Sequence, residues 1–155
     1  MKSRFCVTTR QPRISRHWEP LSVATNRTQP TLVLLHGLLG NADDWQPVIE
    51  AMPGIDCHAL DLPGHGSNKG LRVSGFDEAH EWLCGELAAR GITRYQLAGY
   101  SLGGRLALYH ASQSPAGLQA LLLENCHPGL PVTERAARLK HDEGWARRFE
   151  REPLA

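Results

Sequence analysis

The sequence lacks the features that would assign it to several specialised classes of protein. No apolar run approaches the roughly 20 residues that cross a bilayer, and the basic segment 1–6 is not followed by the apolar stretch of a secretion signal. The net charge of +1 gives no reason to expect a nucleic acid or an anionic membrane as partner. Repeats and low-complexity tracts are also absent. These absences favour a small molecule as the partner.

Cysteine is scarce, and its positions predict neither a disulfide nor a metal site. Cys6, Cys57, Cys84 and Cys126 lie far apart, with no Cys-x-x-Cys pair and no His/Cys spacing of a zinc site. Cysteines spaced in this way are typical of reduced, mostly buried thiols in the cytosol. We therefore predict a cytoplasmic protein that holds no metal and no cofactor. Nothing in the sequence indicates its oligomeric state.

The order of apolar segments predicts an α/β fold with a mostly parallel sheet. A chain of 155 residues is long enough for one domain with a core of its own. Four apolar runs are predicted as strands, and three amphipathic segments between them as helices. The strands are expected at 31–35, 55–60, 95–100 and 118–123, and the helices at 45–52, from Phe76 to Gly91, and at 102–112. This alternation predicts a three-layer sandwich, with helices on both faces of the sheet.

The two ends of the chain differ from this core, which we place at 31–130. Residues 1–30 are predicted as an N-terminal extension, in which 5–8 and 21–24 are possible short strands. Residues 131–155 are charged and helical, and they resemble a lid more than another β-α unit.

Within the lid segment, the pattern predicts two helices with a break between them. Ala136, Ala137 and Leu139 precede the break. Asp142 can cap the second helix, and Trp145 and Phe149 lie four residues apart on one face of it.

A serine lies where a sharp turn is predicted between a strand and a helix. Residues 99–103 are Gly-Tyr-Ser-Leu-Gly. A serine on so tight a turn has a strained backbone, which requires almost no side chain at the flanking positions, and Gly99 and Gly103 meet that need. The pentapeptide also arises by chance in glycine-rich turns. The strand, turn and helix around it are the context of the nucleophile elbow of α/β hydrolases, so Ser101 is predicted to be catalytic.

An elbow serine needs hydrogen-bond donors for an oxyanion. The backbone N–H of Leu102, directly after the serine, is one candidate, and that of Leu38, after the first strand, is the other. His36 precedes this loop. An imidazole at a strand end usually orients a loop by hydrogen bonds, and we favour that role over catalytic base.

The base that would take the serine proton is harder to identify. The order along the chain in this architecture is serine, then acid, then histidine. His110, His127 and His141 follow Ser101, and His127 lies just beyond a strand, with Glu124 as a possible acid. No further β-α unit follows to bring this histidine over the serine, so topology disfavours the pair.

Two arginines point to an anionic substrate. Arg105 follows the serine by one helical turn, and Arg138 projects from the predicted lid. Guanidinium groups that face a pocket bind carboxylates in a bidentate manner. The alternative is that Arg105 makes a surface salt bridge and that Arg138 belongs to a solvated helix face.

Several segments together form a narrower pattern than the elbow alone. Leu-Leu-His-Gly-Leu-Leu-Gly at 34–40 and Asp-Leu-Pro-Gly-His-Gly at 61–66 are common to many α/β hydrolases. More specific are Gly-Tyr-Ser-Leu-Gly-Gly-Arg at 99–105, His-Pro-Gly-Leu at 127–130, and Arg135, Arg138, Trp145, Arg148 and Phe149 after them. From about Thr31 onward the sequence resembles the 2-succinyl-6-hydroxy-2,4-cyclohexadiene-1-carboxylate synthase family of menaquinone biosynthesis.

The resemblance implies a lyase. That family eliminates pyruvate from 2-succinyl-5-enolpyruvyl-6-hydroxy-3-cyclohexene-1-carboxylate. Ser101 would remove a ring proton, while the oxyanion hole would hold the charge that develops on the succinyl carbonyl. Tyr100, Arg105 and Arg138 match substrate-binding residues of the family, and a substrate with several carboxylates gives the arginines their purpose.

Two other functions stay open at this point. One is a hydrolase of esters or carbon–carbon bonds, and the other is a non-catalytic remnant that binds an anion. Members of the resembled family continue through two further strands that carry the triad acid and histidine. We therefore expect this chain to be an N-terminal portion, with the edge of its fourth strand unpaired and little or no activity alone.

Overall fold

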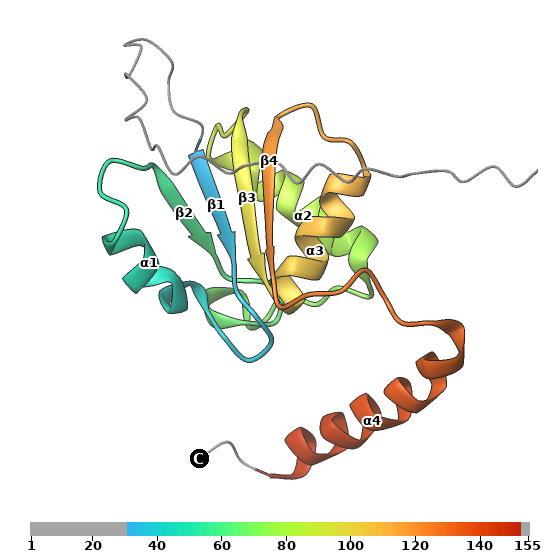
Figure 1. Ribbon diagram of the computed structural model, residues 1–155. Helices are drawn as coiled ribbons and strands as arrows, with labels where there is room; N and C mark the ends of the chain where they lie inside the picture. The colour runs from blue at the N-terminus through green and yellow to red at the C-terminus, as the bar shows by residue number, and fades with distance from the viewer. Residues whose placement is uncertain (1–30, 153–155) are drawn as a thin grey trace, which may run out of the picture.

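The computed structural model describes residues 31–152, which form a parallel four-stranded sheet with helices between the strands (Figure 1). The spatial order of the strands is β2-β1-β3-β4. The possible strands at 5–8 and 21–24 lie outside the described residues. The elements are β1 (Thr31–Leu35), the short 3-10 helix η1 (Ala42–Trp45), α1 (Gln46–Glu50), β2 (Cys57–Leu60), the 3-10 helix η2 (Gly66–Asn68), α2 (Phe76–Ala89), β3 (Tyr95–Tyr100), α3 (Leu102–Ser112), β4 (Leu118–Glu124) and α4 (Val132–Arg151).

The main core lies between the sheet and the pair of helices α2 and α3. Val33 and Leu97 on the strands, Leu83 on α2 and Leu106 on α3 belong to one buried cluster. Successive strand residues point to opposite faces of a sheet, and Leu34, on the opposite face of β1, is 1% exposed. The central strands are therefore covered on both sides, which confirms the predicted three-layer arrangement.

The fourth strand is much less covered than the central ones. Among the described residues β4 pairs with β3 alone. Leu122 is 61% exposed and Leu123 is 38% exposed. The predicted unpaired edge is confirmed for this part of the chain.

The C-terminal segment corrects two details of the sequence prediction. α4 is one continuous helix of 20 residues with no break, and it extends away from the sheet (Figure 1). Asp142 therefore caps no second helix. It lies in the helix interior and accepts hydrogen bonds from Arg138, four residues earlier, and these lower the pKa of its carboxyl. The predicted pair is confirmed, because the Trp145 and Phe149 rings stack with centroids 5.8 Å apart.

Smaller differences occur near the first helix and the cysteines. β2 starts at Cys57, two residues later than predicted, and the first helix begins as η1, which Asn41 caps with its side chain. Cys57 and Cys126 are only half-buried and Cys84 is exposed, so the prediction of mostly buried thiols is wrong for these three. No helix within 31–152 is both long and apolar enough to cross a membrane.

Glycines allow α3 to approach the strands closely. A Cβ atom on Gly99 would lie 2.5 Å from the Gly103 carbonyl oxygen, and one on Gly103 would lie 2.5 Å from the His36 carbonyl oxygen. Real side-chain atoms do not come so near to backbone. The start of α3 therefore packs against both β1 and β3 only because these positions carry no side chain.

This close approach predicts opposite effects for two helical Gly→Ala changes. We expect Gly103→Ala to lower the free energy of unfolding by about 1–3 kcal/mol, because its methyl group would overlap backbone. Gly85→Ala on α2, where nothing lies within 4 Å of the new Cβ, should raise it by about 0.5–1 kcal/mol. Chemical denaturation of both variants measures the two values, and equal effects of the two changes would contradict the packing described.

Candidate active site

Ser101 occupies the sharp turn between β3 and α3. Its backbone has φ 50° and ψ −106°, a conformation that residues with side chains rarely adopt. Two backbone hydrogen bonds hold the turn: Ser101 N–H donates to the Glu124 carbonyl at 2.9 Å, and Gly103 N–H donates to the His36 carbonyl at 3.0 Å. The strand, turn and helix predicted around this serine are present. The strain is the backbone property expected of a nucleophile elbow.

The loop after β1 comes close to the serine. A Cβ on Gly37 would lie 3.5 Å from the Ser101 Cβ and would overlap the Tyr100 ring. Leu38, the next residue, is 62% exposed. Leu102 is the first residue of α3, and the first N–H groups of a helix have no partner within it. The two predicted oxyanion donors, Leu38 N–H and Leu102 N–H, thus belong to the two backbone segments that flank Ser101.

His36 fastens this loop and is not placed as a base. Its side chain is buried, with Nδ1 2.7 Å from the Gly37 carbonyl oxygen and Nε2 3.0 Å from the Leu62 backbone nitrogen. Nδ1 donates and Nε2 accepts, so both nitrogens are used. Burial lowers the pKa of His36, which favours the neutral ring that this pattern needs. The preferred interpretation of His36 as a loop-orienting residue is confirmed.

Asp61 is a structural residue that sequence reasoning treated only as part of a turn. Its carboxylate accepts hydrogen bonds from Ala42 N–H at 2.8 Å, from Ser67 N–H at 2.8 Å and from the Ser67 hydroxyl at 2.7 Å. Burial raises the pKa of Asp61, but these hydrogen bonds outweigh that effect and hold the pKa below its usual value. The charged carboxylate therefore ties η1 to the loop after β2.

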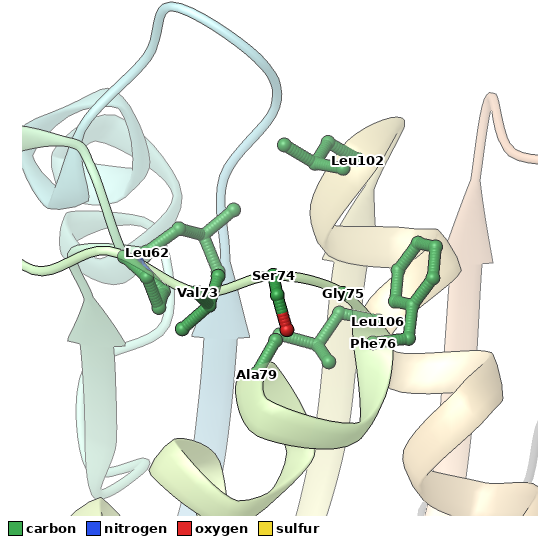
Figure 2. Close-up of a pocket in the computed structure, with 9 residues that line it drawn as sticks. Leu62, Val73, Ser74, Gly75, Phe76, Ala79, Leu102 and Leu106 are labelled. Atoms are coloured by element: carbon green, nitrogen blue, oxygen red, sulfur yellow. The ribbon is translucent and has the colours of Figure 1, made fainter.

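An apolar cavity of ≈ 230 Å³ lies beside the elbow (Figure 2). Leu102 and Leu106 of α3 form one wall, and Phe76 and Ala79 of α2 form another. The rest of the lining comes from Leu62, Pro63, Val73, Ser74 and Gly75. The sequence alone does not predict this cavity, because its lining residues lie up to 44 positions apart, from Leu62 to Leu106, and only the fold brings them together.

A second cavity, of ≈ 330 Å³, brings the two predicted arginines together. Arg105 comes from α3, whereas Arg135 and Arg138 come from α4. Three guanidinium groups and a single carboxylate, that of Asp142, line the space, so its potential favours an anion. The remaining lining residues are His127, Gly129, Leu130 and Leu139.

The arginines of this second cavity differ in how freely they can bind a ligand. Arg138 Nε is 2.7 and 2.8 Å from the two Asp142 carboxylate oxygens, and Arg135 Nε donates to the Leu130 carbonyl at 3.0 Å. Arg105 makes no ion pair among the described residues, and its guanidinium lies 5.4 Å from the centroid of the Phe76 ring. The surface salt bridge considered as an alternative for Arg105 is therefore not observed.

None of the histidines in 31–152 forms a hydrogen bond with the Ser101 hydroxyl. His127 lines the arginine cavity, and its Nδ1 accepts a hydrogen bond from Gly129 N–H at 3.2 Å. His110 lies in α3 at the end far from the elbow, and His141 contacts Trp145 within α4. Tyr100, exposed beside the serine, accepts a hydrogen bond from Asn125 at 3.4 Å. The pairing of His127 with Glu124 as base and acid is not formed.

The sequence is similar to those of several curated synthases that share one name. It is 46% identical over 129 residues to the 2-succinyl-6-hydroxy-2,4-cyclohexadiene-1-carboxylate synthase of Serratia proteamaculans (strain 568), a match that covers 82% of this chain and 51% of that one. It is 48% identical to the synthase of the same name from Enterobacter sp. (strain 638), over 81% of this chain and 49% of that one. The chain spans about half the length of these relatives.

Solved structures and a family model give the same fold. A structure titled MenH from S. aureus superposes with a TM-score of 0.69 at 29% identity, over 83% of this chain and 50% of that one. A marine microorganism esterase superposes with a TM-score of 0.66 at 20% identity, over 79% and 48% of the two chains, which is a likeness of fold alone. The family model of the alpha/beta hydrolase fold matches residues 30–154. The chain therefore belongs to the alpha/beta hydrolase fold family.

Proposed function

We propose that this chain supplies the serine and the anion-binding side of the active site in a 2-succinyl-6-hydroxy-2,4-cyclohexadiene-1-carboxylate synthase. The observation that carries the proposal is an elbow serine one helical turn before Arg105, which lines a cavity together with two further guanidinium groups. An enzyme that acts on simple esters has no need of such a cavity, whereas a substrate with several carboxylates does. The similarity at 46–48% identity to synthases of this name supports the same activity.

The two cavities suit the two parts of such a substrate. The apolar cavity beside Leu102 would take the cyclohexene ring, and the arginine cavity would take the carboxylates. Phe76 lines the first cavity, and Arg105 lines the second with its guanidinium next to the Phe76 ring, so one lining residue of each cavity is in contact with the other. A ring bound on one side and anions bound on the other fix the substrate relative to Ser101.

In this mechanism Ser101 acts as a base and not as an acyl acceptor. An imidazole base from outside the described residues would take the hydroxyl proton of Ser101. The resulting alkoxide would take a ring proton next to the succinyl carbonyl, and the electron pair left on carbon would move toward the carbonyl oxygen. The N–H groups of Leu38 and Leu102 would donate hydrogen bonds to that oxygen as it becomes negative. The electrons then return through the ring, the carbon–oxygen bond to the enolpyruvyl group breaks, and the leaving enolate takes up a proton and becomes pyruvate. No covalent intermediate with the enzyme is needed.

Alternative functions remain distinguishable from this one. An ester or carbon–carbon bond hydrolase on the same scaffold would turn over p-nitrophenyl esters and tolerate loss of the Arg105 charge. A non-catalytic protein would bind carboxylates with no turnover, and binding would survive Ser101→Ala. The cytoplasmic location indicated by the cysteine pattern stays a prediction.

Removing the serine hydroxyl tests the proposed base. In the protein at its natural length, Ser101→Ala should lower kcat for pyruvate release by about 10²–10⁴-fold, the usual contribution of a positioned acid or base. Ser112→Ala, at the other end of α3, is the matched control and should leave kcat unchanged. The rate of pyruvate release is measured by coupling it to the enzymatic reduction of pyruvate to lactate. A Ser101→Ala variant with unaltered pyruvate release would contradict the role of the serine.

Neutralising the arginines tests the anion-binding role. Arg105→Met and Arg138→Met should each raise KM by about 10–100-fold, since a hydrogen bond between charged groups contributes about 1.5–3 kcal/mol. Arg147→Met is the control, because Arg147 also lies on α4 but does not line the cavity. Initial rates over a range of substrate concentrations separate KM from kcat. If all three variants gave the same KM as the unmodified protein, the arginine cavity would not be the substrate site.

A further inference from the structure

A second cluster of reactive side chains lies away from the elbow. His80 and Cys84 come from α2, and His110 comes from α3. One donor atom from each of the three lies within 4.8 Å of the other two. We propose that His80, Cys84 and His110 bind one zinc ion, or an ion of similar preference for nitrogen and sulfur, that links α2 to α3.

The spacing of the donors suits a tetrahedral zinc ion. Residues four apart on a helix lie on the same face, so His80 and Cys84 both face α3. His80 Nδ1 is 3.0 Å from His110 Nδ1, and Cys84 Sγ is 3.7 Å from His80 Nε2. Zinc with ordinary bond lengths to imidazole and thiolate separates two nitrogens by about 3.3 Å and a nitrogen from a sulfur by about 3.6 Å. The two distances involve different nitrogens of His80, whereas a bound ion takes one. Binding therefore requires the His80 ring to rotate and the three donors, which already lie within 4.8 Å of one another, to draw together.

His110 is prepared to act as a ligand. Its side chain is fully buried, and its Nε2 is hydrogen-bonded to the Tyr95 hydroxyl, which leaves Nδ1 directed at His80. Burial, together with the nearby His80, lowers the pKa of His110 to about 4, so the ring is neutral at physiological pH. A ligating histidine whose other nitrogen is held by a second group is the usual arrangement around a bound metal, because that contact fixes the ring.

The cluster is accessible from solvent on one side. Cys84 is exposed and His80 is half-buried, so an ion can enter and a water molecule can take the fourth position. Burial and the neighbouring Glu81 raise the pKa of the Cys84 thiol, so zinc must displace its proton on binding. One sulfur and two imidazole nitrogens favour zinc over magnesium or calcium, which prefer oxygen.

The site is distinct from the proposed active site. Tyr95 begins β3 and Tyr100 ends it beside Ser101, so about 17 Å of strand separates the two regions. The zinc site therefore does not depend on the lyase proposal, and its role is to stabilise the packing of α2 on α3. The spacing in the sequence does not reveal this site, because two of the proposed ligands are on one helix and the third is 26 residues further along the chain.

Metal uptake by the protein at its natural length, without a histidine tag, tests the site. After treatment with a chelator, the protein is given Zn²⁺, freed of excess by gel filtration and analysed for metal. We expect one equivalent of zinc and a rise in Tm. Cys84→Ser and His80→Gln each remove a ligand and should weaken zinc binding by more than about 100-fold. Tyr95→Phe removes only the hydroxyl group that orients His110 and should weaken zinc binding less, by about 10–100-fold.

Matched controls keep the test decisive. Cys126→Ser and His58→Gln remove a half-buried thiol and a half-buried imidazole elsewhere, and both should retain one equivalent of zinc. Co²⁺ in place of Zn²⁺ should give a thiolate-to-cobalt absorption band that disappears in Cys84→Ser. Cys84 is exposed, so this variant keeps its fold, which circular dichroism verifies. Sub-stoichiometric uptake by the unmodified protein, or equal uptake by Cys84→Ser and Cys126→Ser, would show that the cluster is only a hydrogen-bonded network.

Discussion

The close approach of α3 to the strands beneath it is the constraint on which the rest of the site depends. With no side chain on Gly99 or Gly103, the start of α3 rests directly on the backbone of β1 and β3. The chain must then change direction between β3 and α3 at a single residue, Ser101, whose backbone angles are φ 50° and ψ −106°. The same geometry places the N-terminus of α3, with the N–H group of Leu102 and the positive end of the helix dipole, directly after the serine. One packing requirement thus fixes the position of both the proposed catalytic serine and one of its proposed oxyanion donors.

Buried polar side chains hold the loops that surround this turn. The neutral ring of His36 connects Gly37 to Leu62, and the carboxylate of Asp61 connects η1 to the loop after β2. These contacts position one wall of the apolar cavity. The arginine cavity is built differently, because half of its lining residues come from α4, a helix with no buried residue. Anion binding in the proposed enzyme would therefore depend on a more weakly packed element than the serine does.

Local patterns predicted most of the fold, and tertiary contacts determined the rest. The apolar runs and the helix-ending Gly91 located the strands and helices to within a few residues, and the glycine spacing around Ser101 predicted the elbow. The sequence could not show that α4 is continuous, because Asp142 suits a cap and an i,i+4 partner of Arg138 equally well. Nor could it show the proximity of His80 to His110, or the hydrogen bonds of Asp61, since each joins segments distant in the chain. Sites assembled from several elements become visible only in the folded structure.

The central claim is that this scaffold removes a proton and expels pyruvate, and does not hydrolyse an acyl bond. The most direct measurement compares two steady-state rates of the purified protein at its natural length. One is pyruvate formation from 2-succinyl-5-enolpyruvyl-6-hydroxy-3-cyclohexene-1-carboxylate, and the other is hydrolysis of p-nitrophenyl acetate. We expect saturable pyruvate formation with a kcat/KM above about 10⁴ per molar per second, the lower end for ordinary enzymes, and negligible ester turnover. Efficient ester hydrolysis with no pyruvate release would contradict the claim.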